Sequence, residues 1–596
     1  MFETRHRQSL FQTCFVCLFF TIPVYGRTVI VSTKVGKISG YTKDLQADGK
    51  AKTISKFMGI PFAETTAGQN RFLKPIPKAP FNNTFDATGG PIGCIQSSNK
   101  AAQRISKITN FSEDCLNLNV YVPHDFTTNV SLPVMIWIYG GGFNDGASAL
   151  YRADVLTAFT NVIVVTINYR LGMFGFLQSD DGKLPGNQGL WDQHLAIKWV
   201  HDNIAPFTGN PGQVTIFGES ACGASVLFQA LYPGNKEYFQ RVIAESGSPL
   251  ANWATIQEPN AKLFAKSVGC DRSSNWVACI RSKSTSQLQI PRTASNALHF
   301  RPAVDGDFVA EIPEDILYGN NSKSSAAREF YSSLDILSGV NNKDGALLML
   351  ALWPRVLGYS DLNSPKITRD QLNNIVVPHT IDDILLPKDN RTRDILQKLL
   401  IFEYTNWTDP DSFESTRTST VSLSSDAGFF SPAIRAAQAH AMAQNGKTYF
   451  YEFSVPIKNH DIKETPSWII GSNHADELRF VLCEPLFGSN ESTFTEDDKR
   501  VSRAVATLWS NFAKSGNPNT PEDATKYIHA TWPEYTMTSQ KYFQISYQMS
   551  LFSVKDYFYA KRMSLWSELI PKIRKIVIND NVHIPHFDLS GIIFGK

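Results

Sequence analysis

The sequence has almost no net charge. It contains 57 lysines and arginines against 55 aspartates and glutamates, a formal charge of +2 over 596 residues. Nucleic-acid-binding proteins present a basic patch or stripe, and acidic interaction tails form blocks of like charge. Neither pattern occurs here, so the sequence argues against nucleic acid as a partner. With 42% hydrophobic and 19% charged residues and no internal repeat, the composition is that of an ordinary globular protein.

A long hydrophobic run occurs only near the N-terminus. Elsewhere no stretch approaches the roughly 20 apolar residues that a membrane-spanning helix needs, so we expect no transmembrane anchor in the mature chain. At the start, Arg5 and Arg7 precede an apolar run over residues 10–20. This layout predicts a signal peptide over residues 1–26, and the shortness of the run disfavours the alternative of an uncleaved anchor. The mature chain is expected to be secreted or to stay in the lumen of the secretory pathway.

Cysteine is scarce, with eight residues, two of them inside the expected signal peptide. Four others lie in polar, loop-like stretches, where an oxidising compartment favours disulfides. Spacing alone leaves their connectivity open. The pairs that we expect are Cys94 with Cys115 and Cys270 with Cys279. Cys222 and Cys483 lie in or beside apolar segments, which favours buried free thiols, with a bond between the two as the alternative.

Seven Asn-X-Ser/Thr sequons agree with secretion. If glycosylated, each would lie in a surface loop. The possible acceptors are Asn82, Asn110, Asn129, Asn320, Asn390, Asn406 and Asn490.

Strands and helices alternate along the chain. Four apolar runs rich in β-branched and aromatic residues predict buried strands, over residues 134–139, 162–169, 213–218 and 448–453. Their lack of polar alternation is typical of a sheet covered on both faces. Residues 190–204 have apolar side chains at i,i+4 spacing, as in an amphipathic helix. The pattern predicts an α/β fold with a mostly parallel central sheet flanked by helices, and with helical insertions over the sheet, around the mouth of the active site, at about residues 255–440.

The stretch GESACGAS, residues 218–225, follows one of these strands directly. It nearly matches the pattern Gly-X-Ser-X-Gly, in which a serine occupies a strained turn between a strand and a helix with its hydroxyl exposed. Because the strand, turn and helix are all predicted here, we interpret Ser220 as a nucleophile. The last position of the pattern is Cys222, which would itself be the nucleophile if the turn were shifted by two residues.

A nucleophilic serine needs donors for the oxyanion that forms on its substrate. The sequence IYGGGF follows the strand at residues 134–139, and glycine permits the close approach and unusual dihedral angles that such a loop needs. We therefore predict an oxyanion hole from the backbone amides of Gly141, Gly142 and Ala221. An ordinary glycine-rich turn is the alternative.

A histidine and a carboxylate complete the expected site. In hydrolases whose serine occupies such a turn between a strand and a helix, the catalytic residues follow the order serine, acid, histidine along the chain. His474 lies in a loop-like stretch before a helical one, and Asp344 lies in a Lys-Asp-Gly turn after a strand-like run. Taken alone, each is typical of an ordinary structural residue. Together they predict His474 as the general base and Asp344 as the group that orients its imidazole.

At this point the chain resembles the type B carboxylesterase and cholinesterase family of α/β-hydrolases. The matching stretches are ordered and specific, and they run from about Val29 to Trp566. They include FMGIPFAETTAGQNRFLKP, SEDCLNLNVYVP, VMIWIYGGGF, INYRLGMFGFL, GNQGLWDQHLAIKWV, VTIFGES, AESGSPLANW, RPAVDGDF and WSNFAKSGNPN. The resemblance implies one hydrolase domain over residues 27–566, which leaves residues 567–596 as a tail of unknown structure.

The same resemblance implies a function and a set of residues. It implies a triad of Ser220, Asp344 and His474, the oxyanion hole and the two disulfides predicted above, and no metal or organic cofactor. Glu219 takes the family's acidic position beside the nucleophile, where it would bias the charge of the site. Trp253 and Leu298 are expected to line the substrate pocket.

Three departures from the family pattern bear on activity. Asp344 stands where the family usually has glutamate, so backbone placement must offset a side chain shorter by one methylene. Cys222 replaces a glycine that lets helix and strand pack closely, so modest strain is expected there. The loop between the first two disulfide cysteines, residues 95–114, contains no tryptophan, whereas cholinesterases use one there to hold a quaternary ammonium. This last departure argues against choline esters as substrates.

From the sequence we expect a secreted serine carboxylesterase that hydrolyses a small-molecule or lipid ester through an acyl-enzyme. The alternatives are a neutral-lipid lipase of the same mechanism and a catalytically weak or inactive adhesion or binding protein. Such binding relatives usually have a membrane span after the hydrolase domain and have lost triad residues. The sequence does not predict an oligomeric state.

Overall fold

A 13-stranded sheet forms the centre of the molecule. The structure is a computed structural model, and it describes residues 26–573 except 91, 97–109, 127–130, 257–258, 290–299, 383–389, 459, 461–464 and 488–493. Along the sheet the strand order is β1-β2-β3-β7-β9-β8-β10-β11-β12-β13-β14-β15, with β4 paired to β2. A separate two-stranded sheet pairs β5 with β6.

The strands of the large sheet have these bounds: β1 Thr28–Thr33, β2 Gly36–Ala47, β3 Lys50–Pro61, β4 Phe85–Asp86, β7 Asn117–Val122, β8 Leu132–Ile138, β9 Ile163–Ile167, β10 Gly209–Glu219, β11 Arg241–Glu245, β12 Asp335–Asn341, β13 Thr448–Phe453, β14 Lys541–Ile545 and β15 Val554–Asp556. In the small sheet, β5 is Gly93–Cys94 and β6 is Phe111–Ser112. The four strands predicted from apolar runs are β8, β9, β10 and β13.

The centre of the sheet is parallel and its margins are mainly antiparallel, with β4 pairing parallel to β2. From β9 through β8 and β10 to β14, every neighbouring pair is parallel. At the margins, β1 pairs antiparallel with β2, β3 with β7, and β14 with β15. The carboxyl ends of the central strands therefore meet at one edge, where an open α/β sheet offers a site.

The main helices have these bounds: α2 Asp154–Thr160, α3 Gly172–Phe176, α4 Gln188–Asn203, α5 Ala221–Ala230, α6 Ala261–Ser267, α7 Trp276–Ser282, α8 Thr285–Leu288, α9 Pro313–Tyr318, α10 Ser325–Ser333, α11 Ala346–Ala351, α12 Trp353–Leu357, α13 Arg369–Gln371, α14 Val377–Thr380, α15 Asn390–Tyr404, α16 Phe413–Ser425, α17 Ser431–Ala443, α18 Leu478–Val481, α19 Glu496–Ser515 and α20 Ala560–Ser564. Within the described residues, such helices are adjoined by the π-helical segments η7 Leu372–Val376, η9 Asp426–Phe430 and η13 Leu565–Leu569. The predicted helix over residues 190–204 is α4. None of the described helices combines the length and the hydrophobicity of a membrane-crossing segment.

Helices cover both faces of the sheet. Successive residues of β13 point to opposite faces. Tyr451 meets Trp509 of α19, with ring centroids 5.2 Å apart, whereas Phe450 packs in a hydrophobic cluster with Ala437 of α17. All six residues of β13 are buried, as the prediction of a doubly covered sheet requires. The chain thus has the α/β-hydrolase architecture expected from its sequence.

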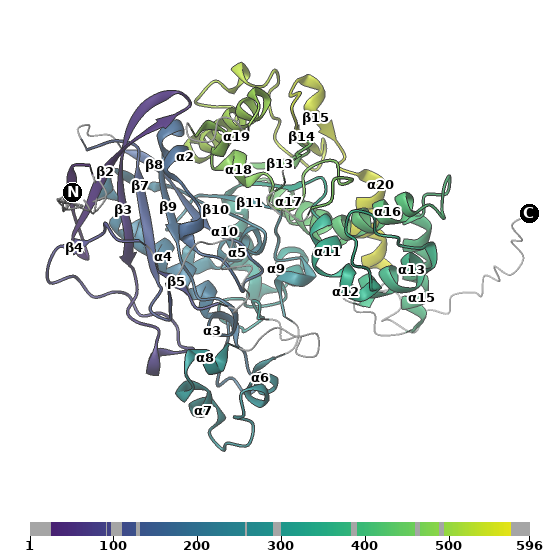
Figure 1. Cartoon of the computed structure of the whole chain (residues 1–596), viewed down its shortest axis with the longest axis horizontal. Coiled ribbons are helices and arrows are strands. Elements are labelled where there is room, and N and C mark those ends of the chain that lie inside the picture. The colour runs from purple at the N-terminus through teal and green to yellow at the C-terminus, as the bar shows by residue number, and fades with distance from the viewer. Residues whose placement is uncertain are drawn as a thin grey trace, which may run out of the picture.

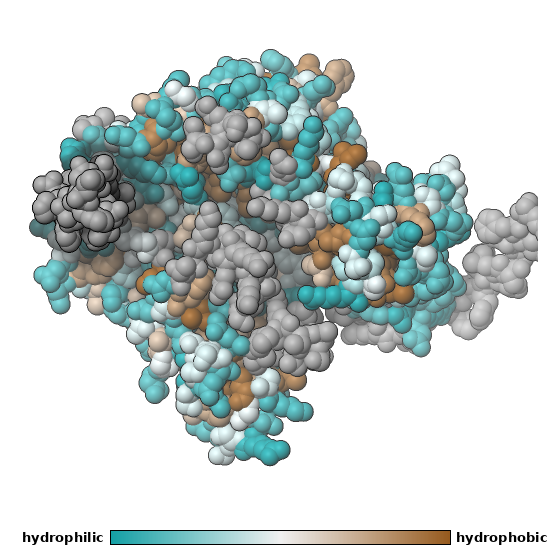
Figure 2. Space-filling view, viewed as in Figure 1, coloured by the Kyte–Doolittle hydropathy of each residue, from teal (hydrophilic) through white to brown (hydrophobic). Residues whose placement is uncertain are grey.

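The helical segment predicted between about residues 255 and 440 lies beside the sheet. Helices α11 to α16 form a lobe at the right of Figure 1. Trp353, Leu396 and Leu400 of this lobe belong to the same hydrophobic cluster as Phe450 of β13 and Ala437 of α17. The segment also contributes β12 to the central sheet, so it is no separate domain. The visible face is mainly hydrophilic, and hydrophobic residues show over this lobe (Figure 2).

The ends of the chain lie partly outside the described residues. The expected signal peptide falls there except for Gly26. Helical structure continues past the predicted domain end at residue 566, through η13 to residue 573. The rest of the predicted tail, residues 574–596, is also outside the described residues.

Candidate active site

Ser220 occupies the sharp turn between β10 and α5. Its φ of 60° and ψ of −125° lie in a region that residues with a side chain rarely adopt. Glycines allow the turn, because a Cβ at Gly218 would be 2.6 Å from Ile138 O and one at Gly223 would be 2.4 Å from Glu245 O. Such strain persists only where the surroundings enforce it, and it is typical of functional positions. The strained residue of the turn is Ser220, in the register that the sequence predicts.

Cys222 lies two residues further on, inside the first turn of α5. The close approach that the family's glycine at this position would provide is made instead by Gly223. The Cys222 thiol is fully buried, donates to Tyr139 O at 2.6 Å and lies 3.1 Å from the Tyr169 hydroxyl. Burial raises its pKa to about 12, so it remains a thiol rather than a nucleophilic thiolate. Cys483 is likewise free and buried, and burial raises its pKa too.

His474 joins Ser220 and Asp344, residues far apart in the sequence. Its Nε2 lies 2.8 Å from Ser220 Oγ, and its Nδ1 lies 2.8 Å from Asp344 Oδ1. The three residues follow β10, β12 and β13 in the chain, so each approaches from the carboxyl edge of the parallel strands. His474 is 4% exposed and Asp344 is fully buried, whereas Ser220 is half-buried and so accessible to a substrate.

The shorter side chain of Asp344 is offset by its surroundings. Its Oδ1 faces His474, while its Oδ2 accepts hydrogen bonds from Asn341 N and from Ser246 Oγ, each at 2.9 Å. Asp344 N donates back to Asn341 O at 3.1 Å, which closes a tight turn directly after β12. The carboxyl group therefore has one fixed orientation, and the contact with the imidazole keeps an ordinary hydrogen-bond length.

The predicted glycine loop lies against Ser220. A Cβ on Gly140 would be 3.1 Å from Ser220 Cβ, which shows how closely this backbone passes. Gly141 and Gly142 have φ values of +117° and +62°, which favour glycine. A Cβ on Gly141 would come within 2.0 Å of Asp145 O, whereas Gly142 has nothing within 4 Å. Ala221, the third predicted donor, is the first residue of α5.

A buried group of carboxyls lies behind the triad. Glu219 Oε1 is 3.1 Å from His474 Nε2. Burial raises the pKa of Glu245 to about 8, and its Oε1 accepts from Trp509 Nε1 at 2.8 Å. Burial and the neighbouring Glu219, Glu245 and Asp344 raise the pKa of Glu477 well above its ordinary value. Glu245 and Glu477 therefore hold their protons more firmly than exposed carboxyls do, and Glu219 is the acidic side chain whose oxygen contacts the imidazole.

The sequence did not single out Glu245, Glu477 or Ser246. A signal was present, because Glu245 ends β11 and Ser246 follows it in the stretch AESGSP, and because Glu477 follows His474 by three residues. Only the parallel pairing of β10 with β11 brings Glu245 and Ser246 beside Ser220. The backbone N–H of Ser220 donates to Glu245 O at 2.9 Å.

Aromatic side chains form one wall of the site. Phe429 of η9 has its ring centroid 4.7 Å from that of His474. Trp253, predicted as a pocket residue, lies 5.7 Å from Phe429 and donates to Gly428 O at 2.7 Å. Leu298, the other predicted pocket residue, lies outside the described residues, as do residues 97–109 of the loop without tryptophan.

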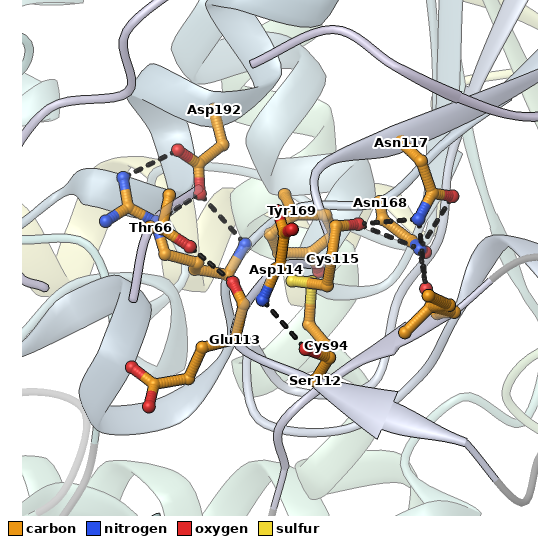
Figure 3. The surroundings of a disulfide bond; sticks show 12 residues. Thr66, Cys94, Ser112, Glu113, Asp114, Cys115, Asn117, Asn168, Tyr169 and Asp192 are labelled. Atoms are coloured by element: carbon orange, nitrogen blue, oxygen red, sulfur yellow. Dashed lines mark hydrogen bonds and ion pairs between the residues drawn. A yellow bond between two sulfur atoms is a disulfide. The ribbon is translucent and has the colours of Figure 1, made fainter. Parts of the chain in front are cut away.

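Both expected disulfides form. The S–S distance is 2.01 Å between Cys94 and Cys115 and 2.09 Å between Cys270 and Cys279. Figure 3 shows the first bond beside Tyr169, whose hydroxyl contacts the Cys222 thiol. Tyr169 therefore lies between this disulfide and Cys222, which follows the turn at Ser220.

The described sequons are exposed: Asn82, Asn110, Asn320, Asn390 and Asn406. Asn129 and Asn490 lie outside the described residues.

Within the described ranges, no group of three or more histidine, cysteine, aspartate or glutamate side chains is arranged to hold a metal ion.

Comparison with known proteins identifies the family of the chain. The chain is 34% identical to an acetylcholinesterase of Bungarus fasciatus over 567 residues, which covers 91% of this chain and 86% of the relative. It is also 34% identical to a bile salt-activated lipase of Bos taurus, covering 90% of this chain and 87% of that protein. Neuroligin-2 of Mus musculus is 30% identical, with 92% of this chain and 68% of the relative covered. A profile of the carboxylesterase family matches residues 27–566, and the chain belongs to that family.

Proposed function

We propose that this protein is a serine hydrolase that cleaves carboxylic esters through an acyl-enzyme. The observation that supports the proposal most directly is the pair of 2.8 Å contacts from His474 to Ser220 Oγ and to Asp344 Oδ1. A nucleophile, a base and a group that orients the base are thereby within hydrogen-bond reach of one another.

In the acylation step, Ser220 Oγ bonds to the ester carbonyl carbon while its proton passes to His474 Nε2. The tetrahedral intermediate collapses, the bond to the alcohol oxygen breaks, and His474 returns the proton to that oxygen. In deacylation, a water molecule gives a proton to His474 Nε2 as its oxygen bonds to the acyl carbon. The bond between that carbon and Ser220 Oγ then breaks, His474 returns the proton to Oγ, and the acid is released. Asp344 keeps the other imidazole proton on Nδ1, so that Nε2 can act as the base.

Two sets of groups would stabilise the charges that develop during the reaction, one at the oxyanion and one at the imidazole. The backbone amides of Gly141, Gly142 and Ala221 would donate to the oxyanion, a contribution worth about 3–4 kcal/mol per donor in comparable sites. Glu219, 3.1 Å from Nε2, would favour the positive charge that the imidazole gains as it takes the serine proton. No cofactor takes part in these steps.

The substrate that we propose is a small-molecule or lipid ester with an apolar acyl group. Phe429 and Trp253 present aromatic surface next to His474, as an apolar pocket with a few polar groups requires. Choline esters are disfavoured, because the loop at residues 95–114 offers no tryptophan for a quaternary ammonium. We further propose that the protein is secreted and glycosylated at its exposed sequons.

Steady-state hydrolysis of a short-chain aryl ester tests the proposal. The wild-type protein should turn the ester over, and Ser220→Ala should abolish turnover. Cys222→Ala is the matched control, since it alters the same turn while retaining the serine, and it should keep most of the activity. Activity lost in Cys222→Ala and kept in Ser220→Ala would assign the nucleophile to the thiol. A wild-type protein that hydrolyses no ester across a range of acyl lengths would favour a binding protein.

A further inference from the structure

The loop that presents His474 is itself strained. It comes shortly before α18 in the chain, and Ala475, directly after His474, has a φ of +67°. A left-handed residue with a side chain costs about 1–2 kcal/mol, so other contacts must hold the loop in this shape. A loop free to relax would move the imidazole away from Ser220.

Asp476 supplies such contacts. Its Oδ2 accepts from Asn473 N at 2.6 Å and lies 2.5 Å from His460 Nδ1. The Asp476 side chain is fully buried, and that of His460 is 5% exposed. His460 and Asp476 are thus a second histidine–aspartate pair, distinct from the triad. Its aspartate lies two residues after His474 in the sequence.

Asn473 connects this pair to His474. Its side-chain Oδ1 accepts from His474 N at 2.7 Å, and its backbone oxygen accepts from Asn341 Nδ2 at 2.8 Å. Asn341 in turn donates its N–H to Asp344. The hydrogen bonds therefore run without a break from His460 through Asp476 and Asn473 to the backbone of His474.

We propose that His460 is a positioning residue, which fixes the loop of His474 through Asp476 so that the imidazole stays in line with Ser220 Oγ. The inference rests on the proposed hydrolase function but concerns a residue outside the triad. When His460 cannot donate, Asp476 loses a buried partner, and the Asn473 backbone that depends on Asp476 is less firmly held. A shift of about 1 Å in a catalytic group can lower the rate about 100-fold.

Two substitutions of His460 separate positioning from simple packing. In His460→Asn the amide nitrogen takes roughly the place of Nδ1 and can still donate to Asp476, whereas His460→Leu fills similar space without a donor. We expect His460→Asn to keep kcat within about threefold and His460→Leu to lose about 10- to 100-fold in kcat, with KM little changed in both. A merely structural role would lower thermal stability in His460→Leu while leaving kcat per labelled active site unchanged.

A second measurement does not depend on turnover. The Nδ1 proton of His474, shared with Asp344, should give a far-downfield proton NMR resonance that stays in place in His460→Asn and shifts or broadens in His460→Leu. If the wild-type protein hydrolysed no ester, the proposed function would fail while this resonance still tested the positioning. Wild-type kcat together with an unchanged resonance in His460→Leu would overturn the inference.

His460→Ala serves as a third variant if the leucine does not fold. It should show the same loss of kcat, and free imidazole should restore part of it by occupying the vacated space. Full activity in His460→Ala without imidazole would overturn the inference as well.

Discussion

Replacing Asp344 by asparagine is expected to keep His474 in place but to put its proton on the wrong nitrogen. The reason lies in the partners of the Asp344 carboxyl. One oxygen accepts from Asn341 N and Ser246 Oγ, and the other faces His474 Nδ1. The asparagine oxygen must take the first position, because an amide group there would set two donors against each other, at a cost of about 1–3 kcal/mol.

The asparagine amide would then donate to Nδ1 of the imidazole. The ring must carry its proton on Nε2, which faces Ser220 Oγ at 2.8 Å. In that tautomer Nε2 cannot accept the serine proton. We therefore expect kcat to fall by about 10,000-fold, equivalent to about 5 kcal/mol in the barrier, as in other triads that lose the tautomer-setting acid.

The assay is steady-state hydrolysis of an aryl ester, normalised to folded protein. Asp154→Asn is the matched control: Asp154 is 1% exposed, lies on α2 and bonds to Lys43 rather than to the site. The control should keep wild-type kcat. A kcat in Asp344→Asn within tenfold of the wild-type value would refute the reasoning and reassign the acid.

Three further outcomes follow from the structure. Gly141→Ala should lower kcat by at least about 100-fold and Gly142→Ala by less than about tenfold. The reason is that a methyl group on residue 141 would collide with Asp145 O, whereas one on residue 142 would meet no atom within 4 Å. Equal losses of kcat in the two variants would contradict the assigned geometry. Burial raises the pKa of Glu245 from 4.5 to about 8, so the stability contributed by its proton is complete below about pH 4.5 and is lost as the pH rises to about 8, by up to about 1.4 kcal/mol per pH unit. Urea unfolding from pH 5 to 8 should show this loss in the wild type and a smaller one in Glu245→Gln, which keeps the buried Glu477; identical pH slopes would contradict it. Cys222 should resist iodoacetamide at pH 8 in the folded protein and react after denaturation, as peptide mass spectrometry would show, and rapid native alkylation would contradict its burial and raised pKa.

The sequence predicted those parts of the fold and site that depend on local pattern. Strands β8, β9, β10 and β13 could be found because a strand covered on both faces reads as an unbroken apolar run. Ser220 could be found because strand, turn and helix follow one another within a few residues. His474 and Asp344 needed chain order and the family resemblance, since neither segment has a local signal of its own.

What the sequence could not predict depends on contacts between distant segments. The role of Glu245 follows from the pairing of β10 with β11, and the approach of Phe429 to His474 follows from the packing of η9. The strain expected at Cys222 also depended on packing. There the close backbone approach falls on the next residue, Gly223, and the thiol occupies a space beside Tyr139.

The central claim is that Ser220 is the residue that becomes acylated. The most direct measurement is peptide mass spectrometry after reaction of the native protein with a fluorophosphonate, which forms a stable adduct with an activated serine. The account predicts a single adduct on the peptide that contains Ser220, formed far more slowly in Asp344→Asn. An adduct on another residue, or no adduct on a correctly folded protein, would contradict it.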